Sequence, residues 1–398
     1  MRSVSEHQAI VAALIRPPAP QDVPVPDAAG RVLATDVHAT RALPAFDNSA
    51  MDGYAVRAAD IAAAGGSSPV RMPVAADIPA GRLDTPALEP GTAHRIMTGA
   101  PMPDGADTVV QVELTDGGTE LVTIQEARVA GTHVRTAGED VTIGDQVLTA
   151  GTVLGPAQLG LLAAIGEASV SVLPALRVLV LSTGSELVEP GLPLLPGQIH
   201  ESNGVMLAAA IDAAGARAER LHFVADEVAA FHAALEPRLS DVDVVVTSGG
   251  VSAGAYEVVK DALSGRGIEF VKVAMQPGMP QGSGTFAGVP VITMPGNPVS
   301  ALVSFEVFLR PALRAAMGFA DVARPVVKAT LAETLDSPAG RRQFRRGFLD
   351  RAAGTVRTIG PPGSHFLRWL AASDSLLDIP EDITSLEAGD VVDVWTLD

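Results

Sequence analysis

The sequence predicts a multidomain protein of the α/β plus β class, with a central parallel α/β domain and additional β-rich domains. Three runs rich in β-branched residues each end in a polar loop, as buried strands of a parallel sheet do: 176–181, 242–246 and 289–294. Helical patterns between them make strand and helix alternate: 204–214, 228–235 and 257–263. Because ligands of such sheets bind at the carboxyl ends of the strands, we expect the functional loops there.

The length of 398 residues also requires more than one domain, because single cores stop growing at roughly 250 to 300 residues. A helix at 5–15 ends before the proline-rich run 17–26, since proline lacks the amide donor that a helix needs. Short alternations broken by Gly, Pro and Asp predict a β-rich domain from Leu43 to Arg135. The remaining expected elements are a helix at 155–165, a domain boundary at Pro174, and the strands of a C-terminal β domain at 326–331, 345–349 and 391–396.

Composition excludes several classes of protein. Lys and Arg number 28 against 46 Asp and Glu, and the formal charge of −18 disfavours nucleic acid and anionic membranes as partners. The absence of cysteine excludes disulfides and thiolate chemistry, and the scattered histidines do not support a zinc site. No apolar run reaches the roughly 18 residues of a membrane span, so we expect a cytoplasmic protein.

The loop at 247–254 follows a predicted strand and has the sequence Thr-Ser-Gly-Gly-Val-Ser-Ala-Gly. Its backbone N–H groups suit an anion such as phosphate, although a tight turn alone would also explain the glycines. Residues 250–254 match the nucleophile elbow of serine hydrolases, with Ser252 as nucleophile and His365 downstream. We therefore retain a serine hydrolase as the third functional hypothesis.

Four further segments allow either a structural or a functional interpretation. Thr183 and Glu186 fit a capping box at a helix start, and Asn297 with Pro298 fits an N-cap before a helix at 299–309. Gly138-Glu139-Asp140 with Arg135 fits a surface ion pair or oxygen ligation of magnesium. Residues 47–54 combine acids and turn formers between aromatic residues, which favours a functional site.

Six segments together resemble the molybdopterin molybdenumtransferases, the molybdenum insertases, in order and approximate spacing: 46–56, 95–101, 138–140, 182–187, 247–254 and 295–301. The resemblance implies a homodimer whose pocket lies where one subunit's α/β domain faces the other subunit's N-terminal domains. It also implies four domains: a linking and dimerisation domain (1–42 and 137–173), an inserted β-rich domain (43–136), a molybdopterin-binding α/β domain (174–320) and a C-terminal β-barrel-like domain (321–398).

The activity implied by the resemblance is insertion of molybdenum from molybdate into adenylylated molybdopterin, with release of AMP and assistance from Mg²⁺. Molybdopterin adenylyltransferase and acceptor molybdoenzymes are the implied protein partners. Positions matched to catalytic residues of the family are Asp52, Thr98, Asp140, Glu186, Asp226 and Glu257, of which Glu186 and Asp52 would hold Mg²⁺. The substrate-binding positions are Arg135, Ser248, Gly249, Gly250, Ser252, Lys260, Pro295, Gly296, Asn297, Arg346 and Ser364.

This chain departs from the family pattern where positive charge is expected. Gln276 and Met279 stand where lysines are common, Glu257 stands where aspartate is usual, and the segment before Gly138 is poorer in arginine. These losses define the second hypothesis, a pterin-binding paralogue or scaffold with weak or no transferase activity. The carboxylates at Asp52, Asp140 and Glu186 favour chemistry over scaffolding.

Overall fold

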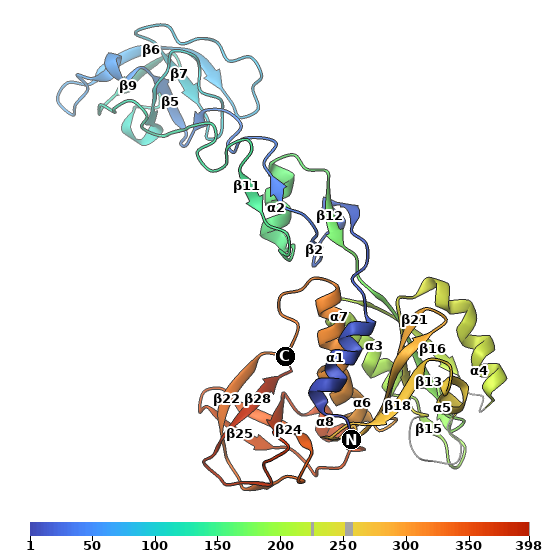
Figure 1. Ribbon diagram of the computed structural model, residues 1–398. Coiled ribbons are helices and arrows are strands. Elements are labelled where there is room, and N and C mark those ends of the chain that lie inside the picture. Colours follow the sequence, from blue (N-terminus) through green and yellow to red (C-terminus); the bar gives the residue numbers. More distant parts are fainter. Residues whose placement is uncertain (224–226, 251–257, 398) are drawn as a thin grey trace. The chain divides into compact units, whose positions relative to one another are not determined.

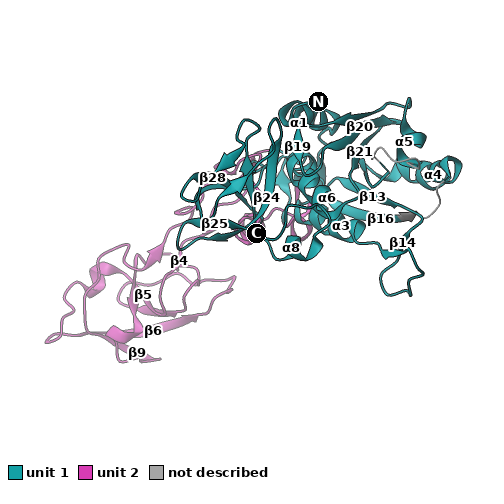
Figure 2. Cartoon of the chain, turned by 90° about the horizontal axis from the view of Figure 1, so that it is seen from below, with its two compact units in different colours: residues 1–22, 30–34, 171–398 teal, residues 23–29, 35–170 magenta. Residues whose placement is uncertain are grey.

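The computed structural model of the chain describes residues 1–223, 227–250 and 258–397. Asp226, Ser252 and Glu257, named above as site residues, lie outside this range. The chain divides into two compact units, which Figure 2 colours separately. Unit 1 comprises residues 1–22, 30–34 and 171–398, and unit 2 comprises residues 23–29 and 35–170.

Unit 1 contains the predicted parallel sheet. Its six strands have the order β16-β13-β17-β21-β20-β18, in which the first four are parallel and β20 and β18 are antiparallel to their neighbours. The bounds are β13 Arg177–Thr183, β16 Arg217–Phe223, β17 Val244–Ser248, β18 Ile268–Lys272, β20 Pro280–Phe286 and β21 Val289–Met294. All three predicted strands are therefore confirmed.

Helices cover both faces of this sheet (Figure 1). Successive side chains of a strand point to opposite faces, so Val178 and Val180 join one core while Leu179 and Leu181 join the other. The first core includes helices α1 (Val4–Leu14), α3 (Asn203–Ala213), α6 (Pro298–Ser304) and α7 (Arg310–Ala316). The second includes α4 (Val228–Leu235) and α5 (Val258–Leu263). Two buried faces explain why the strands are almost wholly apolar.

The helix predicted at 299–309 is longer than expected. Residues 298–316 run through α6, a π-helical turn η5 (Phe305–Leu309) and α7. Pro311 lacks the N–H that would bond the carbonyl of Val307 four residues earlier, and the Gln8 side chain of α1 donates to that carbonyl at 3.0 Å. The apolar pattern therefore continues past the proline because another helix satisfies the freed acceptor.

The C-terminal part of unit 1 is a closed five-stranded barrel, which confirms the barrel-like C-terminal β domain that the resemblance implies. Its strands pair in the order β24-β25-β22-β28-β26, and pairing of β26 with β24 closes the ring. The short β19 (Met275–Gln276) pairs in parallel with β24 and so joins the barrel to the α/β part. The other bounds are β22 Val326–Leu331, β24 Arg342–Asp350, β25 Thr355–Thr358, β26 Ser375–Ile379, β28 Val391–Thr396 and helix α8 Leu367–Ala371.

Unit 2 holds the predicted β-rich segment and the helix α2 (Pro156–Ala164). Its main sheet has the order β8-β5-β7-β6-β9. The bounds are β5 Gly53–Val56, β6 Val70–Ile78, β7 Ala93–Ile96, β8 Thr108–Gln111 and β9 Leu121–Ile124. The unit also contains two short antiparallel pairs: β4 (Asn48–Ser49) with β10 (Val134–Arg135), and β3 (Val37–His38) with β11 (Gln146–Leu148).

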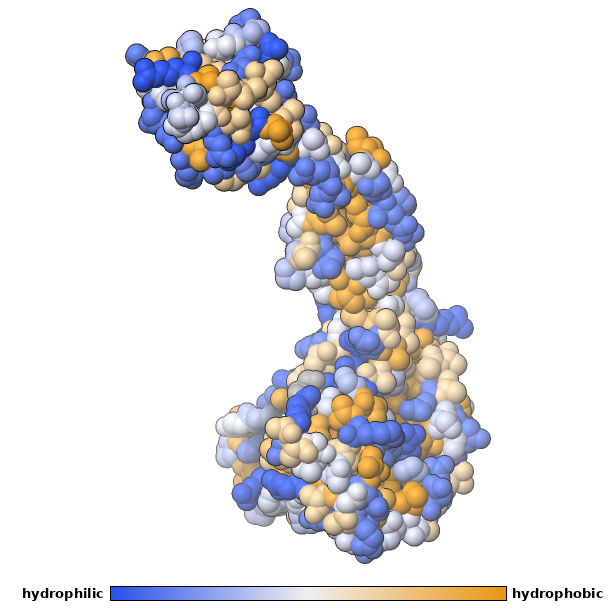
Figure 3. All heavy atoms as spheres, turned by 90° about the vertical axis from the view of Figure 1, so that its left-hand side faces the viewer, coloured by the Kyte–Doolittle hydropathy of each residue, from blue (hydrophilic) through white to orange (hydrophobic). Residues whose placement is uncertain are grey.

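Hydrophilic residues are spread over the visible face of each unit, with hydrophobic residues interspersed (Figure 3). This distribution agrees with the charged residues being 19% of the chain. Within the described residues, no helix has the length and apolar character that crossing a membrane requires.

Candidate functional site

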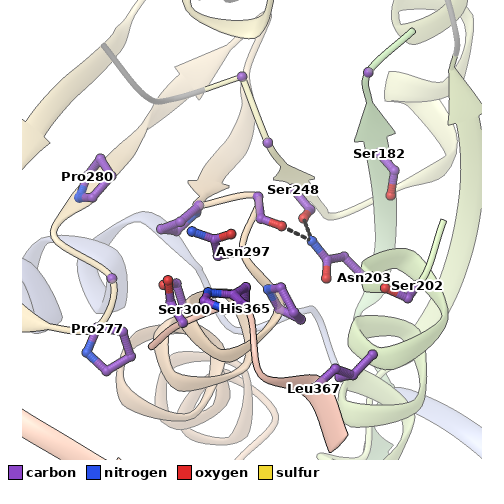
Figure 4. A pocket seen from close by; sticks show the side chains of 18 of the residues that line it. Ser182, Ser202, Asn203, Ser248, Pro277, Pro280, Asn297, Ser300, His365 and Leu367 are labelled. Carbon is purple, nitrogen blue, oxygen red and sulfur yellow. Dashed lines mark hydrogen bonds between the residues drawn. The ribbon is translucent and has the colours of Figure 1, made fainter. Parts of the chain in front are cut away.

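The cavity that the site residues form in unit 1 has a volume of about 1110 Å³ and lies at the carboxyl ends of β13, β17 and β21 (Figure 4). This is the edge at which parallel α/β sheets bind their ligands. Loops of the barrel form the opposite wall. The matched positions that line the cavity are Glu186, Ser248, Gly249, Gly250, Pro295, Gly296, Asn297 and Ser364.

The end of β17 turns sharply at two glycines. Gly249 and Gly250 have φ angles of +95° and +69°, and a Cβ atom on Gly250 would lie 2.7 Å from Cγ2 of Val259. Glycine is therefore required here by conformation and by space. The N–H of Gly249 donates to the carbonyl of Met294 at 3.0 Å, so it is committed to the backbone rather than to a ligand.

Asn297 occupies the N-cap position of α6, as its sequence context predicts, but its side chain makes no capping hydrogen bond. It is exposed on the cavity wall (Figure 4). The backbone N–H of Val299 in the same first turn donates to the carbonyl of Ser364 at 3.0 Å. The helix start thus holds the barrel loop that carries Ser364 and leaves the Asn297 amide free for a ligand.

The capping-box interpretation of Thr183 and Glu186 is wrong. Thr183 ends β13, and the chain then turns into the short strand β14 (Leu187–Val188) rather than into a helix. The turn is closed by the N–H of Leu187, which donates to the carbonyl of Gly184 at 3.1 Å. Glu186 is exposed in the cavity, so its carboxylate is available to a cation or a ligand.

A buried polar network lies behind this wall. The carboxylate of Glu201, a residue only 4% exposed, accepts from the Ser182 hydroxyl at 2.9 Å and from the N–H of Gly204 at 2.5 Å. Two residues on, the Asn203 amide donates to the Ser248 hydroxyl oxygen at 2.8 Å and to the carbonyl of Gly296 at 2.6 Å. These bonds connect the ends of β13, β17 and β21, three separate segments of the sequence.

Arg346 does not line the cavity but holds one of its loops. The residue is 4% exposed, and its guanidinium donates to the carbonyls of Gly363, at 3.1 Å, and Pro361. Burial lowers the pKa of this guanidinium. Arg346 therefore fixes the loop that carries Ser364 and His365 rather than presenting its charge to an anion.

In the described lining of the cavity, Arg341 is the sole Lys or Arg, and the undescribed residues 251–257 contain neither type. It precedes β24, which pairs with β19 beside Gln276, and both Gln276 and Met279 line the cavity as neutral side chains. Lys260 lies exposed on α5, outside the lining residues. The sequence interpretation missed Arg341, Glu201 and Asn203, of which only Asn203 had a local signal as a turn former before a helix.

The matched residues of unit 2 form their own group. The carboxylate of exposed Asp52 accepts from the backbone N–H of Thr98 at 2.7 Å and from its hydroxyl at 2.8 Å, and these bonds lower the pKa of Asp52. Gly53 is required next to it, because a Cβ there would lie 2.0 Å from the carbonyl oxygen of Val110. Arg135 and Asp140 are both exposed, Arg135 on the strand β10 that pairs with β4. Thus Asp52 and Thr98 are joined by two hydrogen bonds that favour the ionised form of the Asp52 carboxylate.

Among the described residues, no group of three or more His, Asp or Glu side chains could hold a metal ion by itself. Magnesium differs from zinc in this respect, because it commonly uses one or two carboxylates together with phosphate oxygens of the substrate. The exposed carboxylate of Glu186 in the cavity suits that mode of binding.

The fold and the cavity define a multidomain α/β protein with a small-molecule site at the carboxyl edge of its sheet. Three family models match the chain: the MoeA N-terminal region (domain I and II) at residues 2–166, a probable molybdopterin binding domain at 179–315, and the MoeA C-terminal region (domain IV) at 328–397. The chain belongs to this family of molybdopterin molybdenumtransferases, and the resemblance stated above is confirmed.

Individual relatives agree over the full length. Molybdopterin molybdenumtransferase 2 of Mycobacterium tuberculosis is 57% identical over 404 residues, covering 100% of both chains. Molybdopterin molybdenumtransferase 1 of the same organism is 39% identical, covering 99% of this chain and 98% of its own. A crystal structure of the molybdopterin biosynthesis MoeA protein from Pyrococcus horikoshii superposes with a TM-score of 0.82 at 31% identity, covering 100% of this chain and 99% of the other. The serine hydrolase alternative receives no support from these relatives.

Proposed function

We propose that this protein inserts molybdenum from molybdate into adenylylated molybdopterin and releases AMP, as an enzyme of molybdenum-cofactor biosynthesis. The observation that carries the proposal is the cavity at the carboxyl edge of the sheet. It gathers Glu186, Ser248 and Asn297 in a chain that resembles named molybdenumtransferases from end to end. Its volume of about 1110 Å³ suits a ligand as large as a nucleotide joined to a pterin.

Each group of site residues has a role that follows from its functional group. Hydroxyl and amide groups of Ser248 and Asn297 are donors for phosphate and pterin oxygens, and Pro295 and Gly296 shape the wall beside them. Arg341 supplies a guanidinium for an oxyanion. Glu186 would hold Mg²⁺ against the phosphates, and the cation would offset their charge when the pyrophosphate bond breaks. Asp52, Thr98, Arg135 and Asp140 serve the same reaction from unit 2.

Three further features belong to the proposal. The protein acts as a homodimer, as members of the family do, with one subunit's N-terminal domains completing the pocket of the other. It works in the cytoplasm on an adenylylated pterin from molybdopterin adenylyltransferase and supplies acceptor molybdoenzymes. Its four domains are 1–42 with 137–173, 43–136, 174–320 and 321–398.

The proposal is tested by measuring AMP release from adenylylated molybdopterin in the presence of molybdate and Mg²⁺. We expect the unsubstituted chain to release AMP, and Glu186→Ala and Asp52→Ala to lose at least about 100-fold of the rate, the usual scale for a group that acts on the reacting centre. Asp84→Ala and Glu126→Ala, which remove exposed acids of unit 2, should keep full activity. Absence of AMP release from the unsubstituted chain would contradict the proposal.

One observation favours a second function. Gln276 and Met279 line the cavity without charge where lysines are common in the family, so an anionic substrate meets fewer cations here. A pterin-binding scaffold would bind adenylylated molybdopterin without releasing AMP. Calorimetric titration with that ligand, run beside the release assay, separates the two functions because only the enzyme gives AMP.

A further inference from the structure

The side chain of Asn203 is held between two loops of the cavity wall. Its Nδ2 atom lies 2.8 Å from the hydroxyl oxygen of Ser248 and 2.6 Å from the carbonyl oxygen of Gly296 (Figure 4). A carbonyl oxygen only accepts hydrogen bonds, so the atom facing Gly296 must be the amide nitrogen. This contact determines the orientation of the Asn203 amide, which would otherwise have two interchangeable ends.

The orientation of Asn203 decides what Ser248 can do. A hydroxyl has one proton to donate and two lone pairs that accept. Because the Ser248 hydroxyl accepts from Asn203, its own proton is left for another acceptor. Within the described residues, no protein group accepts that proton. Ser248 lines the cavity, so the unused proton is available to a bound ligand.

The segment around Asn203 is anchored before any ligand arrives. Glu201 is buried and bonded to Ser182 and Gly204, and its own N–H donates to the carbonyl of Val188 at 2.8 Å. A Cβ atom on Gly204 would lie 3.0 Å from both the Glu201 carboxylate and the Ser182 hydroxyl, so the first turn of α3 packs tightly on this network. Asn203 is therefore presented from a fixed backbone, which lowers the entropic cost of ordering Ser248 when a ligand binds.

We propose that Asn203 is a positioning residue that makes Ser248 a hydrogen-bond donor to an anionic oxygen of the bound nucleotide or pterin phosphate. The inference deepens the proposed function, on which it rests for the identity of the ligand. Without the amide, the Ser248 hydroxyl could rotate and donate its proton to the carbonyl of Gly296 or to water. Asn203 thus acts on the ligand through Ser248.

The test is a double-mutant cycle on Asn203→Ala and Ser248→Ala. We expect each single variant to lower kcat/KM for AMP release about 10-fold to 100-fold, the value of one hydrogen bond to a charged group. If Asn203 acts through Ser248, the double variant should lose no more than the worse single variant. Gln198→Ala, which removes an amide side chain from the same segment outside the cavity lining, should be unchanged. Multiplying effects in the double variant would overturn the inference.

Asn203→Asp gives a second readout that a purely structural role would not move. An ionised aspartate has the same shape but no proton to donate, whereas a protonated one has a single O–H donor. We expect its activity, relative to the unsubstituted chain, to rise at least about threefold as pH falls toward the carboxyl pKa of ordinary aspartate. A constant ratio across pH would count against the inference.

Two outcomes keep this proposal distinct from the proposed function. If the unsubstituted chain releases no AMP, the function fails, and the same four proteins are then compared by calorimetric titration with AMP alone. Coupling between the two substitutions in AMP affinity would still support the link from Asn203 to Ser248. An active chain in which Asn203→Ala has no effect would leave the function intact and overturn the link.

Discussion

The two walls of the cavity differ in how they obtain their polar groups. The α/β wall presents neutral donors, such as Ser248 and Asn297, from strand ends and helix starts that a buried network connects. The barrel wall presents Arg341, which directly precedes the strand β24, and Ser364 and His365 from a loop. Fixed neutral donors recognise a ligand by hydrogen-bond geometry, whereas a guanidinium on a longer side chain attracts anions over a distance.

The difference shows where each wall is vulnerable. The α/β wall is stabilised by several hydrogen bonds among strand ends, so its shape does not depend on one side chain. The barrel loop is secured mainly by one guanidinium, that of Arg346, with the Val299 N–H contributing at Ser364. We therefore expect a single substitution in the barrel wall to lower stability and activity more than a single substitution in the α/β wall.

The largest effect should follow Arg346→Met. The substitution removes the two hydrogen bonds that the guanidinium donates to the carbonyls of Gly363 and Pro361, at a cost of about 3 kcal/mol. We expect the free energy of unfolding to fall by that amount in urea titrations, with a loss of roughly 100-fold in kcat/KM as Ser364 and His365 lose their positions. Arg345→Met, at the adjacent position of β24, is the control because neighbouring side chains of a strand point to opposite sides. Equal losses of stability and of kcat/KM in both variants would show that the hydrogen bonds of Arg346 do not fix the loop.

A smaller effect, on the free energy of unfolding, should arise in the core of the α/β part as pH falls. His7 of α1 is fully buried against Phe308, and burial lowers its pKa from 6.5 to about 4. The unfolded chain takes up a proton as pH falls through about 6.5, but the folded chain does not until about 4, so stability is complete above this window and declines within it. Between pH 7.5 and pH 5 the loss from His7 should be about 2 kcal/mol.

Urea unfolding at both pH values measures this loss. His7→Leu should be less sensitive to acid than the unsubstituted chain by about 2 kcal/mol, since leucine has no proton to take up. His38→Leu, at an exposed histidine, should keep the acid sensitivity. If His7→Leu lost as much stability in acid as the unsubstituted chain, another group than His7 would cause the acid lability.

Local sequence patterns predicted most elements of the α/β part and the barrel, which carry the two walls. The strands β21, β22 and β28 and the helix α4 occur at the predicted residues, because their apolar patterns are strong. The capping box at Thr183 failed for a physical reason, since Leu187 and Val188 gain a strand partner in β15 (Ile199–His200). A local motif was outweighed by a pairing with a segment more than ten residues away.

The site was predicted only where its residues lie in recognisable loops. Ser248, Gly249, Gly250 and Asn297 lie in loops that follow predicted strands, and the family resemblance matched them to substrate-binding positions. Arg341 and Glu201 were not, because their importance arises from what they meet in three dimensions: β19 beside β24 for Arg341, and the end of β13 for Glu201. Likewise, the orientation of Arg346 toward loop carbonyls cannot be read from a motif that names it as an anion ligand.

The smallest effect should follow changes of charge on the barrel wall. Arg341→Met removes the guanidinium of the described cavity lining, and we expect KM for molybdate to rise about tenfold, whereas Arg341→Lys should lose less because it keeps the charge. Met279→Lys should lower that KM about threefold at low salt by restoring a cation at a lining position, and the gain should shrink as ionic strength rises. If Arg341→Met left KM unchanged at every salt concentration, attraction of the anion would belong to the neutral donors of the α/β wall, and the division of roles between the two walls would be wrong.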